Sequence, residues 1–311
     1  MIDTYMQPLP HGITLSCRAS GTPGQPVLLF LHGFPEGAFV WDTLLEHFSQ
    51  PENGGYRCVA PNLRGFEQSS APKEVSAYRP KHLVQDISAM IAIETQHTGG
   101  KLTCLVAHDW GGAVAWNLGN QHPELSHRLV IINSPHPGTF LRELKTNPAQ
   151  QAASAYINFL IRPDAEKLLA QDDYRRLWKF FTEWNSGLAL PAWLTDEVRD
   201  QYRQVWNAGL TGGCNLYRAS PLRPPRAGDP AAAAVDLPHD MLTVSLPTLV
   251  IWALDDVALP PALIDGLDEY IGQLTIETVA GASHWIVHEQ PQLIAGFLQR
   301  FLTTHQSDGA E

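Results

Sequence analysis

The sequence predicts an α/β protein in which a mostly parallel central sheet is flanked by helices and interrupted by a helical insertion. Short, continuous apolar runs recur through the first 135 residues and again near the C-terminus, as expected of strands buried on both faces of a parallel sheet. Segments with helical spacing lie between these runs. A long aromatic-rich stretch in the middle of the chain shows no comparable strand pattern.

The apolar runs mark the predicted strands, at residues 27–31, 56–60, 102–107, 128–132, 247–252 and 274–279. Leu83, Val84, Ile87, Met90 and Ile91 repeat every three or four residues, which predicts a helix between the second and third runs. A last helix is predicted at 291–302, followed by a polar tail.

The insertion divides the chain into three parts. Residues 1–136 and 244–311 form the two pieces of one sheet-containing core, and residues 137–243 form the helical insertion. Within the insertion, residues 221–240 contain too many prolines for a helix, so we expect a long irregular loop there.

Composition and charge limit the classes of partner. The 311 residues include 32 acidic and 21 basic side chains, for a net charge of −11, which disfavours binding to nucleic acid or to anionic membranes. The sequence shows no membrane-spanning run and no export signal, and its four cysteines are scattered. We therefore expect a cytoplasmic protein with no metal site; nothing in the sequence specifies an oligomeric state.

The strongest motif is Ala107-His108-Asp109-Trp110-Gly111, which lies between a predicted strand and a predicted helix. Small residues on either side of the central position allow a tight turn that exposes the central side chain above the sheet. That side chain is a carboxylate, Asp109, which is ionised at neutral pH and needs no base in order to attack a saturated carbon. We therefore predict that Asp109 is a nucleophile that forms an alkyl ester.

Two further motifs supply the groups that would complete the reaction. His32-Gly33-Phe34-Pro35 follows the first buried strand, and the backbone N–H groups of Phe34 and Trp110 are predicted to form an oxyanion hole, with His32 as a further substrate-binding candidate. His284 follows the last strand and is the predicted general base. Of the adjacent carboxylates Asp255 and Asp256, loop position favours Asp256 as the group that orients His284.

Together these motifs resemble the α/β-hydrolase superfamily, and within it the branch that has Asp at this turn. The resemblance covers nearly the whole chain and implies an α/β-hydrolase fold with a helical cap and with neither a metal nor an organic cofactor. That branch contains soluble epoxide hydrolases, haloalkane dehalogenases and fluoroacetate dehalogenases. The chain departs from the wider superfamily at Glu67, where a second Gly is more usual.

The resemblance to soluble epoxide hydrolases extends into the insertion. Those enzymes use two cap tyrosines to protonate the epoxide oxygen. Tyr156, seven residues before Pro163, resembles the first, and Tyr217, in Asn215-Leu216-Tyr217-Arg218, resembles the second. A phenol stays protonated at neutral pH, as an oxygen leaving group requires and a halide does not.

The two dehalogenase classes are alternatives that share the same predicted triad. Trp110 matches one halide donor of haloalkane dehalogenases, but Phe34 occupies the place of the Asn that supplies their second donor, which leaves a cap tryptophan such as Trp178 or Trp184 for that role. Fluoroacetate dehalogenases place an Arg where this chain has Trp110.

We therefore expect an epoxide hydrolase that converts a small apolar epoxide and water into a vicinal diol. A haloalkane or haloacid dehalogenase is the alternative within the same branch. A ligand-binding member of the fold without enzymatic activity is a further, more distant alternative.

Overall fold

The computed structural model of this chain describes residues 1–183 and 191–304, and its strands form one eight-stranded sheet in the order β1-β2-β4-β3-β5-β6-β7-β8. All pairs from β4 onward in this order are parallel. The strands are β1 (Asp3–Pro8), β2 (Thr14–Ser20), β3 (Val27–Leu31), β4 (Arg57–Pro61), β5 (Cys104–His108), β6 (Leu129–Ile132), β7 (Thr248–Ala253) and β8 (Leu274–Val279). The predicted mostly parallel α/β fold is confirmed, and each predicted strand is present to within two residues.

The first two strands have no counterpart in the sequence prediction. β1 pairs antiparallel with β2, and β2 pairs antiparallel with β4, at one edge of the sheet. β1 has no fully buried residue, so its sequence lacks the continuous apolar run that identified the other strands. The sheet is therefore mixed at this edge and parallel elsewhere.

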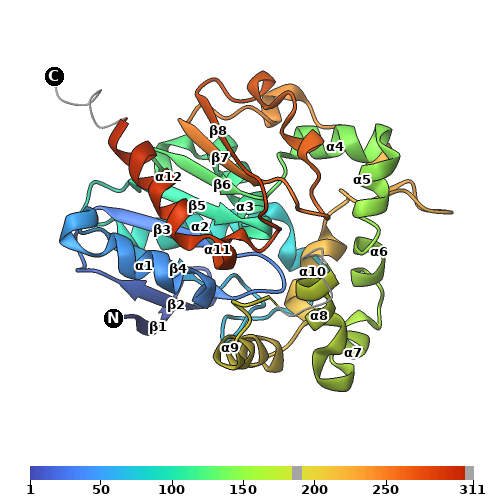
Figure 1. Ribbon diagram of the computed structural model, residues 1–311, viewed down its shortest axis with the longest axis horizontal. Helices are drawn as coiled ribbons and strands as arrows, with labels where there is room; N and C mark the ends of the chain where they lie inside the picture. Colours follow the sequence, from blue (N-terminus) through green and yellow to red (C-terminus); the bar gives the residue numbers. More distant parts are fainter. Residues whose placement is uncertain (184–190, 305–311) are drawn as a thin grey trace.

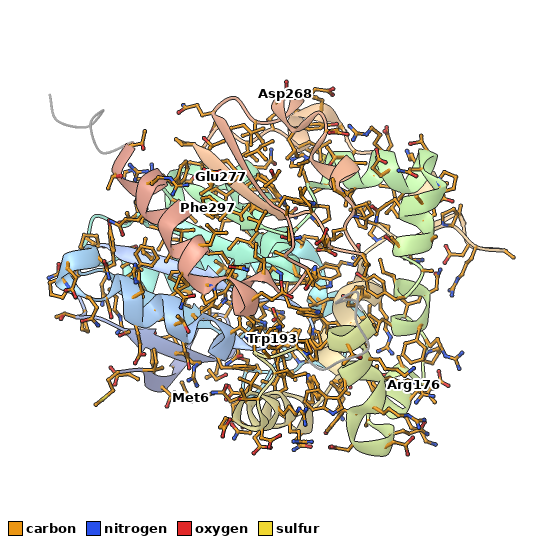
Figure 2. The ribbon with its side chains drawn as sticks, viewed as in Figure 1. Met6, Arg176, Trp193, Asp268, Glu277 and Phe297 are labelled. Atoms are coloured by element: carbon orange, nitrogen blue, oxygen red, sulfur yellow. The ribbon has the colours of Figure 1, made fainter. Side chains whose placement is uncertain are left out.

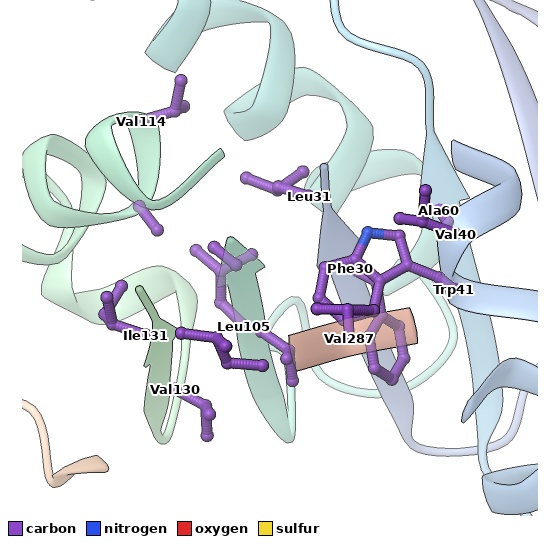
Figure 3. Packing of buried hydrophobic residues seen from close by; sticks show 14 of the residues in the cluster. Phe30, Leu31, Val40, Trp41, Ala60, Leu105, Val114, Val130, Ile131 and Val287 are labelled. Carbon is purple, nitrogen blue, oxygen red and sulfur yellow. The ribbon is translucent and has the colours of Figure 1, made fainter. Parts of the chain in front are cut away.

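The parallel strands bring distant segments of the chain to one edge of the sheet. Leu31 pairs with Ala107, and His108 pairs with Ile132, so β3, β5 and β6 end at about the same level. The strand interiors are fully buried, and Figure 3 shows Phe30, Leu105 and Ile131 packed within this core. The loops that follow β3, β5 and β6 therefore lie next to one another at this edge of the buried sheet.

Helices cover both faces of the sheet. In Figure 1, α1 and α12 lie in front of the sheet, whereas α2 and α3 lie behind it and pack against each other. Their bounds are α1 (Asp42–Phe48), α2 (Pro80–Glu94), α3 (Asp109–Gln121), α11 (Ile286–Glu289) and α12 (Pro291–Thr304). No helix in the described part of the chain is both long and apolar enough to cross a bilayer.

The segment between β6 and β7 is built of helices and loops, and it gathers on one side of the molecule (Figure 1). Its α-helices are α4 (Pro137–Thr146), α5 (Pro148–Ala153), α6 (Ile157–Leu160), α7 (Ala165–Leu169), α8 (Gln171–Glu183), α9 (Asp196–Asn207) and α10 (Thr211–Ala219). After α10 the chain has no α-helix or strand until β7, as the prolines predicted. Short 3₁₀ turns complete the described chain: η1 (Ala38–Trp41), η2 (Pro51–Asn53), η3 (Val75–Tyr78), η4 (Pro123–Leu125), η5 (Ala231–Ala234), η6 (His239–Met241), η7 (Pro261–Ile264) and η8 (Leu267–Glu269).

Two glycines seat α10 against the core. A Cβ on Gly212 of α10 would lie 2.3 Å from the Cα of Gly65, and a Cβ on Gly65 would lie 2.5 Å from the Cα of Gly212. Gly65 also has a positive φ of +85°, a conformation that other residues rarely adopt. The backbone of α10 therefore packs directly on the backbone of the loop after β4.

Glu67 lies in the same loop, at the position where the superfamily that this sequence resembles more usually has Gly. Its φ is +47°, so the backbone keeps the left-handed conformation that a glycine would adopt most easily. The carboxylate accepts hydrogen bonds from Ser16 and from the amide of Asn62, the latter at 2.8 Å. These two contacts hold Glu67 in a backbone conformation that is unfavourable for its residue type.

Candidate active site

Asp109 stands at the sharp turn between β5 and α3. Its φ of +48° is unusual for a residue with a side chain and directs the carboxylate away from the sheet edge. The turn is possible because Gly111 has no side chain: a Cβ there would lie 2.4 Å from the carbonyl oxygen of Leu31. The backbone therefore makes the tight turn between strand and helix that the motif predicts.

One oxygen of the Asp109 carboxylate lies against backbone amides. Oδ1 accepts a 2.7 Å hydrogen bond from the N–H of Phe34, and the N–H of Trp110 also donates to this carboxylate. The close approach depends on Gly33, where a Cβ would lie 2.3 Å from Oδ1 of Asp109. The backbone N–H groups of Phe34 and Trp110 thus both contact the Asp109 carboxylate, and Phe34 contacts it at Oδ1.

His284 faces the second oxygen. Its Nε2 lies 3.7 Å from Oδ2 of Asp109, and its Nδ1 lies 2.6 Å from Oδ2 of Asp256. The separation on the Asp109 side is too long for a direct hydrogen bond and suits a reactant that approaches both groups. All three side chains are brought together by loops that follow β5, β7 and β8.

Asp256 is held rigidly. Oδ1 accepts hydrogen bonds from the N–H groups of Ala258 and Leu259, both at 2.9 Å, and Oδ2 accepts a 2.8 Å bond from the side chain of Asn133 as well as the bond with His284. Asp255 is not placed against His284, and its backbone N–H donates to the carbonyl of Ala282. The carboxylate that contacts the histidine is the one that loop position favoured.

Burial and neighbouring charges set the ionisation of the two facing groups. Burial raises the pKa of Asp109, opposed by the charges of His284 and His108 and by the Phe34 and Trp110 amides. Burial lowers the pKa of His284, but the attraction of Asp256 and the added charges of Asp109 and Glu36 outweigh it and raise that pKa to about 9. At neutral pH the His284 side chain that faces Asp109 is therefore protonated and positively charged.

This raised pKa links protein stability to pH. Because the pKa of His284 is about 6.5 when unfolded and about 9 when folded, its stabilising contribution is complete below pH 6.5 and is lost as the pH rises through 9. We expect the free energy of unfolding to fall by about 3 kcal/mol between pH 6 and pH 9.5. Urea unfolding of the protein and of His284→Gln at both pH values measures this. An equal fall in the variant would contradict the linkage.

Two tyrosine side chains line the cavity that contains Asp109. Tyr156, which precedes α6, and Tyr217 of α10 line the same cavity as Asp109, their rings are 6.1 Å apart, and their hydroxyls are hydrogen-bonded to each other. Tyr217 also packs edge-on against Trp110 at 4.9 Å. Burial and the charge of Asp109 raise the pKa of both tyrosines. Both hydroxyls therefore remain protonated over the whole physiological range.

His32 is the predicted site residue that the structure does not bring to the cavity. Its side chain is fully buried; Nδ1 contacts the carbonyl of Gly33 at 2.8 Å, and Nε2 accepts a 3.0 Å hydrogen bond from the N–H of Leu63. Burial lowers its pKa to about 4, so it is neutral. Because both ring nitrogens are bonded to the backbone, His32 joins two loops and does not bind substrate; the prediction for this residue was wrong.

A buried polar network behind the site was absent from the sequence prediction. Glu36 is completely buried and contacts His108 (Oε2 to Nδ1, 3.0 Å) and the hydroxyl of Tyr202 (3.2 Å). His108 also contacts the backbone carbonyl of His284 at 2.9 Å. Burial opposes ionisation of Glu36, but its hydrogen bonds and the charges of His108 and His288 hold its pKa well below the usual range.

The same network reaches the helical segment. The hydroxyl of Tyr202 in α9 lies 2.8 Å from Nε2 of His288, and His288 stacks on Trp193 with the rings 4.3 Å apart. Trp193 is labelled in Figure 2. The sequence offers one signal for this network, since Glu36 is a lone acid in an otherwise apolar stretch that follows the His32–Pro35 motif. Among the described residues, no group of three or more histidines, cysteines and carboxylates forms a candidate metal site.

Comparison with known proteins places this geometry in a family. A family model described as alpha/beta hydrolase fold matches residues 26–291. Over 94% of this chain and 95% of the relative, the sequence is 33% identical to the AB hydrolase superfamily protein YfhM of Bacillus subtilis. It is 31% identical to epoxide hydrolase 3 of Xenopus tropicalis over 96% of this chain and 77% of that protein.

A solved structure gives a similar result. That structure is described as one of the novel epoxide hydrolases belonging to the alpha/beta hydrolases superfamily in metagenomes from hot environments. The two chains share 37% sequence identity with a TM-score of 0.83, over 98% of this chain and all of the other.

Proposed function

The chain belongs to the α/β-hydrolase fold family, and from that premise we propose that it hydrolyses an epoxide to a vicinal diol through an ester on Asp109. The resemblance to this superfamily and to epoxide hydrolases is confirmed by the family match and by relatives that carry that name. The helical segment 137–243 then acts as a cap that supplies Tyr156 and Tyr217, and the core supplies the carboxylate and the histidine.

In the first half-reaction Oδ2 of Asp109 attacks a ring carbon. The carbon–oxygen bond of the ring breaks, its electron pair goes to the epoxide oxygen, and that oxygen takes a proton from Tyr156 or Tyr217. Oδ1 already accepts a hydrogen bond from the N–H of Phe34, whereas Oδ2 faces His284, so Oδ2 is the oxygen that reacts. The product is an alkyl ester with its carbonyl oxygen in the amide pocket.

The second half-reaction hydrolyses that ester. His284 removes a proton from water, and the water oxygen attacks Cγ of Asp109. The negative charge develops on Oδ1, where the N–H groups of Phe34 and Trp110 stabilise it. When the intermediate collapses, the alkyl oxygen takes the proton that His284 removed from water and leaves as the second hydroxyl of the diol. The other proton of that water passes from Asp109 to the tyrosine that protonated the epoxide oxygen, so Asp109 is again a carboxylate.

Ester formation itself prepares His284 to act as a base. In the resting site the charge of Asp109 contributes to the raised pKa of His284. The ester carries no charge, so this contribution disappears and the pKa of His284 falls, while the larger contribution of Asp256 remains. His284 therefore gives up its proton more readily once the ester has formed, which is the step at which a neutral imidazole is needed as the base.

The observation that carries the proposal is the pair of protonated phenols beside the carboxylate. An epoxide oxygen leaves as an alkoxide and needs a proton, whereas a halide does not. The dehalogenase alternative requires a second halide donor from the helical segment. The indole N–H of Trp178 donates to the carbonyl of Asp173 at 2.8 Å and is committed there, and Trp184 lies outside the described residues.

The test is to incubate the protein with styrene oxide and, separately, with a bromoalkane, and to measure diol and bromide. We expect diol from the first substrate and no bromide from the second. Bromide without diol would instead indicate a dehalogenase, and turnover of neither compound nor of a wider set of epoxides would favour a ligand-binding protein.

A further inference from the structure

The cavity above Asp109 is long and runs along one face of α3. It has a volume of about 580 Å³, and the α3 residues in its wall begin at Asp109, pass through Ala113 and Asn117, and end at Gln121. These positions repeat every three or four residues, so they share one side of the helix. At 1.5 Å per residue the wall is roughly 18 Å long.

Asp109 lies at the closed end of this cavity. Behind it Phe34 packs edge-on against Tyr217 with the rings 5.3 Å apart. Phe34 and His284, which contact the Asp109 carboxylate, are both buried, and neither belongs to the described cavity wall. Within the described residues the cavity therefore ends at Asp109, and a second large substituent on the reacting carbon would meet Phe34 or His284.

The other end opens to solvent. Gln121 and Asp240 are exposed, and Met241 is 60% exposed. Between the two ends the wall is mostly apolar, with contributions from Phe140, Leu222, Val235 and Leu237. A flexible apolar chain can enter from the open end and be removed from water along its whole length.

The charges on the wall are all negative. Among the described residues that line the cavity there is no Lys, Arg or His, and the ionisable carboxylates are Asp109 at the closed end and Asp240 at the mouth. The whole protein carries a net charge of −11. A substrate whose free end is a carboxylate would be repelled by Asp240 and by the protein as a whole.

We propose that the substrate is a terminal epoxide on a long, unbranched, uncharged chain, which lies along α3 with its free end at Asp240. The proposal rests on the proposed epoxide hydrolysis and specifies its substrate class. The ring is at the end of the chain because the cavity formed by the described residues extends from Asp109 along α3 and not past Phe34. The chain is uncharged because no basic side chain in the described cavity wall can pair with an anion.

Two isomers test the position of the ring. 1,2-Epoxydodecane and 6,7-epoxydodecane have the same atoms and nearly the same hydrophobicity. The second would have to place a five-carbon arm at the closed end. We expect kcat/KM for diol formation to be at least about tenfold higher for the terminal isomer. Equal values, or a preference for the internal isomer, would overturn the proposal.

The free end is tested with methyl 11,12-epoxydodecanoate and the corresponding acid. We expect kcat/KM to be roughly fivefold lower for the acid, the effect of one unit charge at about 4 Å in water. The Asp240 side chain is exposed, so Asp240→Lys should reverse this preference, with Asp240→Asn intermediate. A preference for the acid in the unmodified protein would exclude an uncharged substrate class.

A substitution within the cavity tests its direction. Ala113 lies one turn beyond Asp109, and Ala113→Trp should obstruct the cavity there. We expect the ratio of kcat/KM for 1,2-epoxydodecane to that for 1,2-epoxybutane to fall tenfold or more, since each methylene that loses its burial costs about fourfold. An unchanged ratio in the folded variant would contradict the path along α3.

Failure of this inference can be told from failure of the proposed function. If 1,2-epoxybutane and styrene oxide give diol but the long terminal epoxide has no advantage over its internal isomer, the substrate class is wrong and the reaction stands. If no epoxide gives diol, the proposed function itself is wrong.

Discussion

His284→Gln is expected to stop turnover after the first chemical step and to leave the substrate covalently attached to Asp109. The variant keeps Asp109, the amide pocket and the tyrosines, so an epoxide can still be opened. It lacks the base that activates water, so steady-state diol formation should fall by about a thousandfold. Intact-mass measurement after addition of styrene oxide should show one adduct per chain.

The control and the site of attachment follow from the structure. His122 is partly exposed and pairs with Glu124 on the surface, so His122→Gln should keep full turnover and show no adduct. Peptide mapping should place the adduct on Asp109, and the double variant Asp109→Ala, His284→Gln should carry none. Diol formation at the normal rate by His284→Gln would contradict the two-step scheme.

Loss of both cap phenols is expected to slow the ring-opening step more than any other change that leaves the carboxylate in place. Each of Tyr156→Phe and Tyr217→Phe removes one donor from the leaving oxygen, so the rate of adduct formation should fall by roughly tenfold to a hundredfold. The double variant should lose about a thousandfold or more, because the alkoxide then forms without a proton donor.

The measurement uses the His284→Gln background, where adduct formation reports ring opening alone. Tyr174→Phe is the matched control: Tyr174 belongs to the same helical segment, but its hydroxyl donates to Asn207 at 2.5 Å and its side chain is not part of the cavity wall. If both single variants opened the epoxide as fast as Tyr174→Phe does, the two tyrosines would not be the proton donors.

The parts of the fold that were predictable from sequence are those in which one physical requirement dominates. Strands buried on both faces must be continuously apolar, so β3, β5 and β6 were identified with small errors at their ends. β1 lies at the edge of the sheet, half in solvent, and its composition does not distinguish it from a loop.

In the candidate site, too, some residues could be predicted from the sequence and others could not. Asp109 and His284 occupy loops at strand ends, where motif and position define them. Asn133 and Glu36 act through contacts with residues that are far away in sequence, namely Asp256 and Tyr202, and no local pattern specifies such contacts. His32 was misassigned because a buried histidine bonded to backbone and a substrate-binding histidine can have the same neighbours in sequence.

The contact between Gly65 and Gly212 has a consequence for changing the specificity of this protein. Main chain rests on main chain there, so α10 cannot be moved by exchanging side chains at the contact. Tyr217, which belongs to α10, should therefore keep its position relative to Asp109 even when other residues that line the cavity are substituted. Libraries aimed at new substrates should therefore randomise the chain after α10 (220–242) and the residues around Tyr156, and leave the glycine pair untouched. Selections that include Gly65 or Gly212 should return glycine at both positions.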